Sequence, residues 1–259
     1  MLSSERQQYI AKYVQENRFV DIKTLSEILN ISEKTIRLDL NKLQDMGILK
    51  RVHGGAQAKD NDDSYTYHSR QSENVEQKIV IAREAYNLVN DGDVVYLDDG
   101  STTIHLARLL ANKNITVLTA DINIVNALAP YENITIYVIG GKIRRTGDTI
   151  MTTGYESVRS INDYHISKLF IGTTAIDSEQ GLMIFYDDNR TYKRALIDNS
   201  EVKICLADSS KFNKKAFSKF AQFSDLDYLI TDSSIPKECE EAIKNKVKLI
   251  IAGQKEDQL

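Results

Sequence analysis

The 259-residue sequence has no apolar stretch that approaches the roughly 18 residues of a membrane-spanning helix. Its first ten residues, MLSSERQQYI, are polar from the third residue onward and lack the apolar core of a signal peptide. Both absences predict a cytoplasmic protein with no membrane partner.

Cysteine is also scarce, because only Cys205 and Cys239 occur and they lie far apart in the sequence. Cys205 lies in an apolar run, so a reduced, buried thiol is expected rather than a disulfide. No cysteine pair has the spacing of metal ligands, and the four histidines are scattered: His53, His68, His105 and His165. We therefore expect neither a metal site nor another cofactor.

The composition is that of an ordinary globular protein, with 42% hydrophobic and 27% charged residues. The length suits one small domain and one of about 150–200 residues. The net charge of −4 is unevenly distributed: residues 1–59 hold ten Lys and Arg against seven Asp and Glu, +3, which leaves −7 for the rest. This asymmetry favours a polyanion as the partner of the N-terminal end.

Three helices are predicted in the first sixty residues. The first runs from about Ser4 to Glu16, and the second begins at Thr24, where Thr24 and Glu27 form a capping box. The third follows the N-cap Ser32 and ends near Gly47. Their inward apolar positions recur at helical spacing: Tyr9, Ile10, Tyr13 and Val14, then Leu25, Ile28 and Leu29, then Ile36, Leu40 and Leu43.

The outer faces of the third helix carry side chains that suit a groove of DNA. Arg37 and Asn41 have donors for base edges, and Lys34 and Lys42 suit phosphates. The early residues of such a helix lie nearest the bases. The predicted DNA-binding residues of this helix are Ser32, Lys34, Thr35, Arg37, Leu38, Asn41 and Lys42.

The segment from Ile48 to Ala56 predicts a β-hairpin, or wing, because apolar and polar residues partly alternate before two glycines. The predicted DNA-binding set therefore also contains Arg51, His53, Gly54 and Gly55. The residues leave one alternative open, since any three-helix bundle can carry a basic, solvated outer face. The order of capped helix, short turn, second capped helix and basic hairpin favours DNA.

Residues 1–58 resemble the N-terminal domain of DeoR-family repressors, whose motif has the form S-x-x-T-I-R-R-D-L…L-x-x-x-G-x-L-x-R-x-H-G-G-A. The matching residues here are Ser32, Thr35-Ile-Arg37-Leu38-Asp39-Leu40, Leu43, Gly47, Leu49, Arg51 and His53-Gly-Gly-Ala56. Leu38 stands where the family usually has a second Arg. Asp39 is expected to pair with a basic side chain, such as Arg51, rather than to read bases.

A polar linker is predicted at residues 59–76, and short apolar runs alternate with helical stretches in residues 77–259. This alternation predicts an α/β domain with a largely parallel sheet. Strands are expected at Val94–Leu97, Ile115–Thr119, Ile134–Ile139, Lys168–Ile171, Val202–Ala207, Tyr228–Thr231 and Lys248–Ile251. Helices are expected at Gln77–Val89, Thr103–Leu110, Ile122–Leu128, Tyr155–Ile161, Asp188–Asn199 and Pro236–Lys244.

Polar loops follow several of these strands, where parallel sheets bind their ligands. In the first, Asp98–Thr103, glycine, hydroxyls and a helix N-terminus suit a phosphate. Each loop alone could equally be a helix cap or a plain turn, but their recurrence favours a polyhydroxylated phosphate ligand. The predicted effector-binding residues are Asp98, Gly100, Ser101, Thr102, Thr103, Asp121, Gly141, Lys142, Lys193, Asp208 and Lys211.

Residues 77–235 resemble the sensor domain of DeoR regulators through Leu97-Asp98-x-Gly100-Ser-Thr-Thr103, Val117-Leu-Thr119, Ile139-Gly-Gly141, Phe170-Ile-Gly172 and Leu206-Ala-Asp208-Ser-Ser-Lys-Phe212. The resemblance implies a winged helix-turn-helix followed by a Rossmann-like α/β sensor domain similar in fold to ribose-5-phosphate isomerase. The chain departs from the family at Ala120-Asp121 and Asn189-Arg190, both in segments expected to line the ligand site.

The resemblance implies a sequence-specific transcriptional regulator, most often a repressor of sugar metabolism genes. Its expected partners are a double-stranded DNA operator, a phosphorylated sugar effector and further copies of itself, as a dimer or tetramer. One alternative is a sugar-phosphate isomerase that carries a helix-turn-helix, for which Asp98, Asp99, Asp121 and Lys142 are available, although the catalytic segments of isomerases are not matched. Another is an interaction module that has lost ligand binding. We expect a regulator and not an enzyme.

Overall fold

The structure is a computed structural model, and it describes residues 3–17, 19–46, 48–52, 54–58, 73–146, 149–184 and 188–253. The chain divides into two compact units, Met1–Ser64 and Tyr65–Leu259. Residues 59–72 lie outside the described ranges, so the domain boundaries 1–58, 59–76 and 77–259 stay a prediction.

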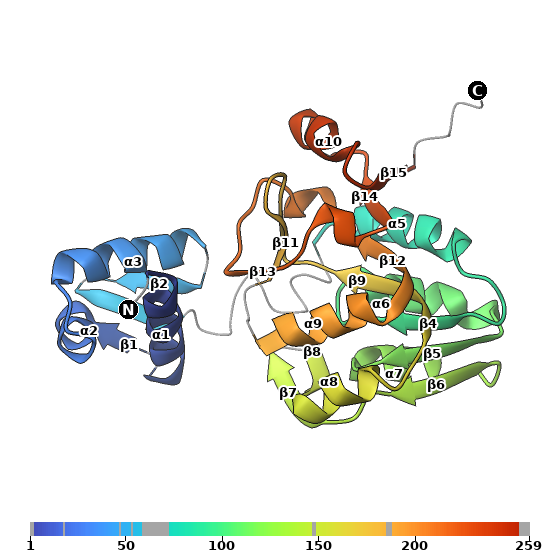
Figure 1. Ribbon diagram of the computed structural model, residues 1–259, viewed down its shortest axis with the longest axis horizontal. Helices are drawn as coiled ribbons and strands as arrows, with labels where there is room; N and C mark the ends of the chain where they lie inside the picture. Colours follow the sequence, from blue (N-terminus) through green and yellow to red (C-terminus); the bar gives the residue numbers. More distant parts are fainter. Residues whose placement is uncertain are drawn as a thin grey trace. The chain divides into compact units, whose positions relative to one another are not determined.

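The smaller unit combines three helices with a small antiparallel sheet (Figure 1). The strand order is β1-β3-β2, in which β2 and β3 form the predicted hairpin and β1 was not predicted. The helices are α1 (Ser3–Asn17), α2 (Ile22–Leu29) and α3 (Glu33–Asp45), and the strands are β1 (Phe19–Asp21), β2 (Leu49–Val52) and β3 (Gly55–Ala58).

Side-chain caps set the starts of α2 and α3. Ser32 caps α3 as predicted, because its hydroxyl accepts a hydrogen bond from the backbone N–H of Thr35 at 3.3 Å. The predicted start of α2 at Thr24 is wrong. Asp21 is the N-cap, and its carboxylate accepts both the backbone N–H of Thr24 at 2.8 Å and the Thr24 hydroxyl at 2.7 Å. The Asp21 carboxylate is a stronger acceptor than the Thr24 hydroxyl, so α2 begins at Ile22, two residues before the predicted start.

One apolar cluster holds the smaller unit together. Two residues expected to face inward do not, because Tyr9 is 40% exposed and Ile28 is 43% exposed. The burial of the other apolar side chains stabilises the unit. The buried members of the cluster are Ile10, Val14, Val20, Ile22, Leu25, Ile36, Leu40, Leu43, Leu49 and Ala56.

The larger unit is built on a seven-stranded sheet whose described neighbours all pair in parallel. All seven predicted strands are confirmed as members of this sheet. In sheet order they are β15 (Lys248–Ala252), β14 (Tyr228–Asp232), β12 (Ser200–Leu206), β9 (Ile166–Gly172), β4 (Val94–Leu97), β5 (Ile115–Thr119) and β6 (Ile134–Val138).

Helices cover both faces of this sheet, because alternate strand residues enter two separate cores. Val95, Leu97 and Phe170 pack against α5, α6 and α7, whereas Tyr96 and Leu169 pack on the face of α8, α9 and α10. The predicted helices are confirmed within two residues at each end: α5 (Val75–Asn87), α6 (Thr103–Leu109), α7 (Ile122–Leu128), α8 (Tyr155–Ile161), α9 (Asp188–Asp198) and α10 (Lys237–Ile243). Short 3-10 turns lie at Leu110–Asn112, Ser209–Lys211 and Phe223–Asp225.

Two small sheets of the larger unit were not predicted. One is a hairpin of β7 (Lys142–Thr146) and β8 (Thr149–Thr153). The other has three strands in the order β10-β11-β13, namely Ala175–Asp177, Gly181–Ile184 and Ser218–Ala221.

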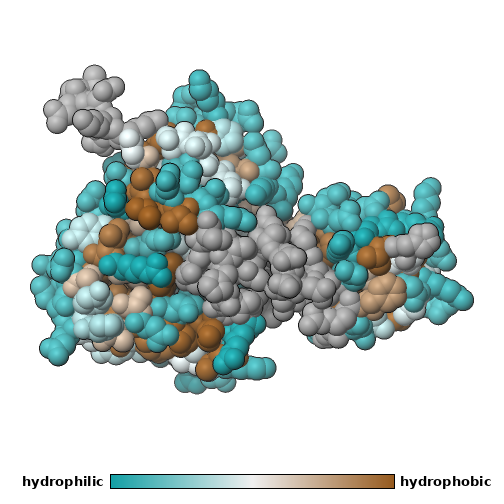
Figure 2. All heavy atoms as spheres, turned by 180° about the vertical axis from the view of Figure 1, so that it is seen from behind, coloured by the Kyte–Doolittle hydropathy of each residue, from teal (hydrophilic) through white to brown (hydrophobic). Residues whose placement is uncertain are grey.

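Among the described residues, no helix has both the length and the apolar character to cross a membrane. Apolar side chains reach the surface of the larger unit in separate areas between hydrophilic ones (Figure 2).

The strand order reverses between β4 and β9. From β4 the chain continues through β5 and β6 toward one edge of the sheet, and it then returns to build β9, β12, β14 and β15 toward the other. Ligands of doubly wound sheets bind beyond the carboxyl ends of the strands at such a reversal. A ligand site is therefore expected at the residues that follow β4 and β9.

Candidate functional site

The outer face of α3 presents the predicted DNA-binding side chains to solvent. Lys34, Arg37, Asn41 and Lys42 are exposed, and Leu38 is 55% exposed although it is apolar. Thr35 is half-buried beside the cap Ser32, whose hydroxyl lies 3.0 Å from the Thr35 hydroxyl.

Arg37 is held by a weak local contact. Its guanidinium donates to the Glu33 carboxylate at 2.9 Å, one turn earlier on the same helix, and both side chains are about half exposed. An exposed pair of this kind contributes little free energy, so DNA can replace Glu33 as the partner of Arg37 at small cost.

The hairpin is fastened to α3 by Arg51. The Arg51 guanidinium donates to the Asn41 side-chain oxygen at 2.6 Å, and the Arg51 backbone N–H donates to the Gln44 side chain at 2.8 Å. The expected pairing of Asp39 with Arg51 is wrong. Asp39 is buried against α1, where it accepts from Arg6 at 2.5 Å and Gln7 at 2.8 Å.

The two glycines of the hairpin have different structural roles. Gly54 has a φ of 79°, a left-handed conformation that favours glycine. A Cβ on Gly55 would collide with the backbone carbonyl of Val20, so glycine there lets β3 approach β1 closely. His53 lies outside the described residues, and the contacts of all these residues with DNA stay predictions.

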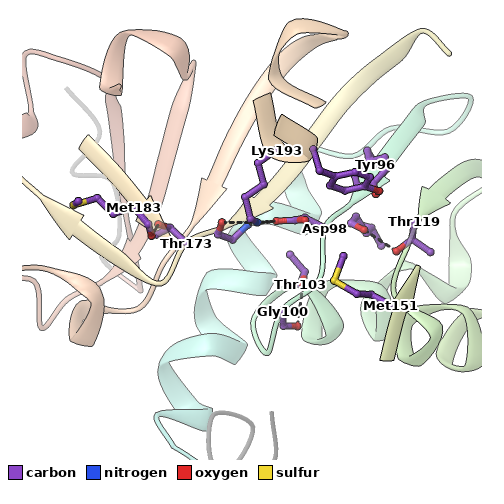
Figure 3. A network of polar contacts seen from close by, with 12 residues as sticks. Tyr96, Asp98, Gly100, Thr103, Thr119, Met151, Thr173, Met183 and Lys193 are labelled. Atoms are coloured by element: carbon purple, nitrogen blue, oxygen red, sulfur yellow. Dashed lines mark hydrogen bonds and ion pairs between the residues drawn. The ribbon is translucent and has the colours of Figure 1, made fainter. Parts of the chain in front are cut away.

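In the larger unit, a buried ion pair joins the ends of β4 and β9. Asp98 directly follows β4, and its Oδ2 accepts from the Lys193 ammonium and, at 3.0 Å, from the backbone N–H of Gly172 at the end of β9. Lys193, on α9, also donates to the Gly172 carbonyl at 3.1 Å. Figure 3 shows Lys193 pointing to Asp98, with Thr103, Met151 and Thr119 grouped around the same end of the sheet.

Both members of this ion pair are almost fully buried. Burial raises the pKa of the Asp98 carboxyl to about 7, while the Lys193 ammonium acts in the opposite direction. Burial lowers the pKa of Lys193, but the carboxylates of Asp98 and Asp99 outweigh it and the net shift is upward. The ammonium therefore stays charged at neutral pH, and Asp98 Oδ1 has no hydrogen-bond partner in the described part of the chain.

The loop from Gly100 to Thr103 leads from Asp98 into α6. The Thr103 hydroxyl donates to the Gly100 carbonyl at 2.9 Å and closes the turn. Within the described ranges, the backbone N–H groups of Ser101, Thr102 and Thr103 donate to no protein acceptor. These donors at a helix start are free for an anion.

Asp121 occupies the equivalent place at the end of β5, the strand next to β4. It caps α7 by accepting from the Asn123 backbone N–H at 2.8 Å, and it bridges to Met151 of β8. Its Oδ2 has no hydrogen-bond partner among the described residues. Burial raises the pKa of Asp121 to about 6.

The other predicted effector residues lie further from this ion pair. Lys142 is exposed on β7. Gly141 packs its backbone on β8, since a Cβ there would lie 2.7 Å from the Thr153 carbonyl oxygen. Asp208 follows β12, two strands from β4; it caps a 3-10 turn, lies 3.9 Å from the Lys211 ammonium and accepts from Asn74 at 3.2 Å.

Sequence reasoning missed two contributions to this end of the sheet. The hydroxyls of Tyr96 and Tyr192 hydrogen-bond to each other beside Lys193, and β8 brings Met151 against Asp121. Tyr192 precedes Lys193 in the chain, so the sequence could have pointed to it as a neighbour of Lys193. Nothing in the sequence indicates that Tyr192 contacts Tyr96. Within the described ranges, no group of three or more His, Cys, Asp or Glu could hold a metal ion.

Two family models match the chain. A model described as the DeoR C terminal sensor domain matches residues 73–233, and one described as the DeoR-like helix-turn-helix domain matches residues 6–62. The chain belongs to the DeoR family. It is therefore a transcriptional regulator with a DNA-binding helix-turn-helix unit and an effector-sensing C-terminal unit, as the sequence predicts.

Relatives match along nearly the whole length of this DeoR-family chain. The uncharacterized HTH-type transcriptional regulator FruR from Bacillus subtilis (strain 168) is 36% identical, covering 90% of this chain and 92% of FruR. The transcriptional repressor GlcR from the same strain is 31% identical, covering 99% of each chain. The glycerol-3-phosphate regulon repressor from Escherichia coli (strain K12) is 30% identical over 91% of this chain and 93% of its own length. These relatives are regulators, which confirms the prediction that the chain is not an enzyme.

A comparison with solved structures finds ribose 5-phosphate isomerase A from Methanocaldococcus jannaschii, with 20% identity and a TM-score of 0.40. The match covers 55% of this chain and 56% of the isomerase.

Proposed function

We propose that this DeoR-family regulator is a repressor of sugar metabolism genes, which binds its operator as a homo-oligomer and releases it when a phosphorylated sugar binds the larger unit. The observation that carries the proposal is the buried Asp98–Lys193 pair at the reversal of strand order. It lies directly before a loop in which three backbone N–H groups donate to no acceptor among the described residues. The name of one relative, the glycerol-3-phosphate regulon repressor from Escherichia coli, contains a phosphorylated compound and supports a phosphorylated effector.

In this proposal the phosphate binds the N–H groups of Ser101, Thr102 and Thr103, where the dipole of the helix start favours an anion. The hydroxyls of the sugar donate to the unpaired carboxylate oxygens of Asp98 and Asp121.

The DNA side of the proposal rests on the exposed face of α3. Inserted into the major groove, α3 places Arg37 and Asn41 at base edges and Lys34 and Lys42 at phosphates. The exposed Leu38 suits the methyl group of thymine, which a second Arg at this position would not.

The effector can change operator affinity only if it binds the operator-bound and operator-free states of the protein with different affinities. A difference of about 1–3 kcal/mol changes operator affinity by roughly 5- to 150-fold. We expect such a decrease in fluorescence anisotropy titrations of a labelled duplex from the DNA upstream of the gene, when one member of a sugar-phosphate panel is added. The same sugars without phosphate are the matched controls.

Substitution of Ser101 separates the two functions. Ser101→Asp places a carboxylate among the proposed phosphate donors, so it should leave operator affinity unchanged and abolish release. Ser224→Asp introduces the same charge at an exposed serine of the larger unit and should respond like the wild type. Normal release by Ser101→Asp, or unchanged operator affinity with every sugar phosphate, would contradict the proposal.

A further inference from the structure

The two edges of the seven-stranded sheet differ in charge. The edge strand β15 begins with the exposed Lys248, and the exposed Lys244 and Lys246 precede it. The other edge strand, β6, reads Ile-Thr-Ile-Tyr-Val and carries no charge. Open edges present unpaired N–H and C=O groups, and proteins keep other strands away from them with charged side chains, especially lysine. The edge at β15 has this protection, whereas β6 does not.

Exposed apolar side chains gather at the same end of the sheet. Among the described residues of the larger unit, six large hydrophobic side chains are exposed. One of them, Leu109 at 36%, lies on α6. The other five are Tyr131 (37%), Tyr137 (47%), Val138 (45%), Ile143 (56%) and Tyr155 (77%).

Backbone packing brings three of these residues around one junction. Gly141 joins β6 to β7, and its missing side chain lets it contact the end of β8. The Ser157 hydroxyl of α8 donates to the Gly140 carbonyl at 2.6 Å. Val138, Ile143 and Tyr155 therefore flank the same junction, and with Tyr137 they form the β6 edge patch.

We propose that the β6 edge patch is the surface on which a second copy of this chain docks, with the two β6 strands side by side and antiparallel about a two-fold axis. A two-fold contact uses the same surface on both copies, so it must be complementary to itself. The uncharged strand β6 meets this requirement. The proposal rests on the proposed function in one respect, because paired operator half-sites call for two copies.

Charges that flank β6 complement each other in this arrangement. Glu132 precedes the strand and Lys142 follows it; both are exposed, and neither has an ion-pair partner within the described ranges. Antiparallel pairing brings the acidic end of each strand toward the basic end of the other. Glu132 of one copy then faces Lys142 of its partner, twice in each dimer.

Sedimentation velocity on the full chain, over a range of protein concentrations, tests the surface. The wild type should self-associate reversibly. Val138→Lys and Ile143→Lys each place a charge in a patch that docking would bury, and should raise the dimer dissociation constant at least about tenfold. Lys248→Glu alters the opposite edge of the sheet, so this variant should associate like the wild type.

A charge exchange distinguishes contact across the axis from a general loss of fold. Glu132→Lys and Lys142→Glu should each weaken association, and the double variant should restore it. Rescue of this kind measures a pairwise interaction that destabilised single variants cannot imitate.

Several outcomes would overturn the proposal: a wild type that is monomeric at concentrations where it binds its operator, patch variants that associate normally, a control variant that weakens association equally, or a double variant that fails to recover. Thermal shift with the sugar-phosphate panel on the same proteins keeps the proposed function separate. If the variants respond to a sugar phosphate but the association results contradict the docking surface, only the surface is rejected. If the protein dimerises as proposed but responds to no sugar phosphate, only the effector site is rejected.

Discussion

In the helix-turn-helix unit the side chains proposed to meet DNA are solvated, with Arg37 tied only to the exposed Glu33. In the sensor unit the side chains proposed to meet the effector are buried, with Asp98 and Lys193 paired at 1% and 6% side-chain exposure. A rigid polyanion is read by charges that the protein can leave in water until binding. A small polar ligand requires a site in which donors and acceptors are already desolvated and oriented.

This contrast has an energetic consequence. Exposed charges cost the fold almost nothing, whereas each buried charge carries a desolvation penalty that its partner must offset. Substitutions in the first unit should therefore change binding and leave stability nearly unchanged, while substitutions in the second should change both.

The largest expected effect is that of Lys193→Met. It leaves the buried Asp98 carboxylate without its cation, which should lower the free energy of unfolding of the sensor unit by about 3–5 kcal/mol. Urea denaturation measures the change, and adding Asp98→Asn should recover part of it. Lys215→Met removes a cation that is 62% exposed beside Asp177 and should cost under about 0.5 kcal/mol. Equal losses from the two variants would erase the contrast between buried and exposed charges.

Asp121→Asn should stabilise the sensor unit in a pH-dependent way. Because burial raises the folded-state pKa of Asp121 to about 6, the wild type loses stability as pH rises from about 4 to about 6, where the folded protein holds the proton more tightly. The amide keeps an oxygen for the Asn123 N–H and carries no charge, so a gain of about 1–3 kcal/mol is expected at pH 8 and none below pH 4.

Asp177→Asn is the matched control of opposite sign. Burial alone would raise the pKa of Asp177, but the backbone N–H groups of Gln180 and Glu179 lower it below its ordinary value. The ionised form therefore stabilises the fold above the unfolded-state pKa, and this contribution is lost as pH falls through the folded-state pKa. Denaturation at several pH values should show the asparagine destabilising at pH 8. A gain for both variants would show that the charge of Asp121 is not the cause.

Arg37→Ala should weaken specific operator binding by about 1–3 kcal/mol and change stability by less than about 0.5 kcal/mol. Anisotropy on operator and scrambled duplexes measures the first quantity, and thermal denaturation measures the second. Glu33→Ala removes the competing partner of Arg37 and should leave operator affinity equal or higher. An equal loss for Arg37→Ala on scrambled DNA would assign Arg37 to phosphates only.

The smallest effect concerns Ser32, which is both the cap of α3 and a predicted DNA contact. As a cap, Ser32→Ala should cost about 1 kcal/mol of stability and Ser32→Gly only a few tenths. If the hydroxyl also contacts a phosphate, both variants should lose the same operator affinity. Denaturation and anisotropy on the pair separate the two roles, and affinity losses that follow stability would leave Ser32 as a cap alone.

Sequence periodicity predicted the seven strands of the large sheet and the long helices because these depend on neighbours a few residues apart. The sequence predicted the wrong start for α2, where two nearby residues could each act as the N-cap. Asp21 and Thr24 are both good caps, and only the fold shows that β1 ends at Asp21 and frees its carboxylate for α2.

The sequence by itself determined the kind of protein this is: Ser32 and the spacing of Ile36, Leu40 and Leu43 set α3, and alternating strands and helices set the α/β class. Only the tertiary structure decided the partners of buried charges. It paired Asp39 with Arg6 rather than Arg51, and Asp98 with Lys193, 95 residues away. The helix and strand periods involve residues only a few positions apart in the chain. The counterion of a buried charge depends on which distant elements become neighbours in the fold, and no local pattern encodes that.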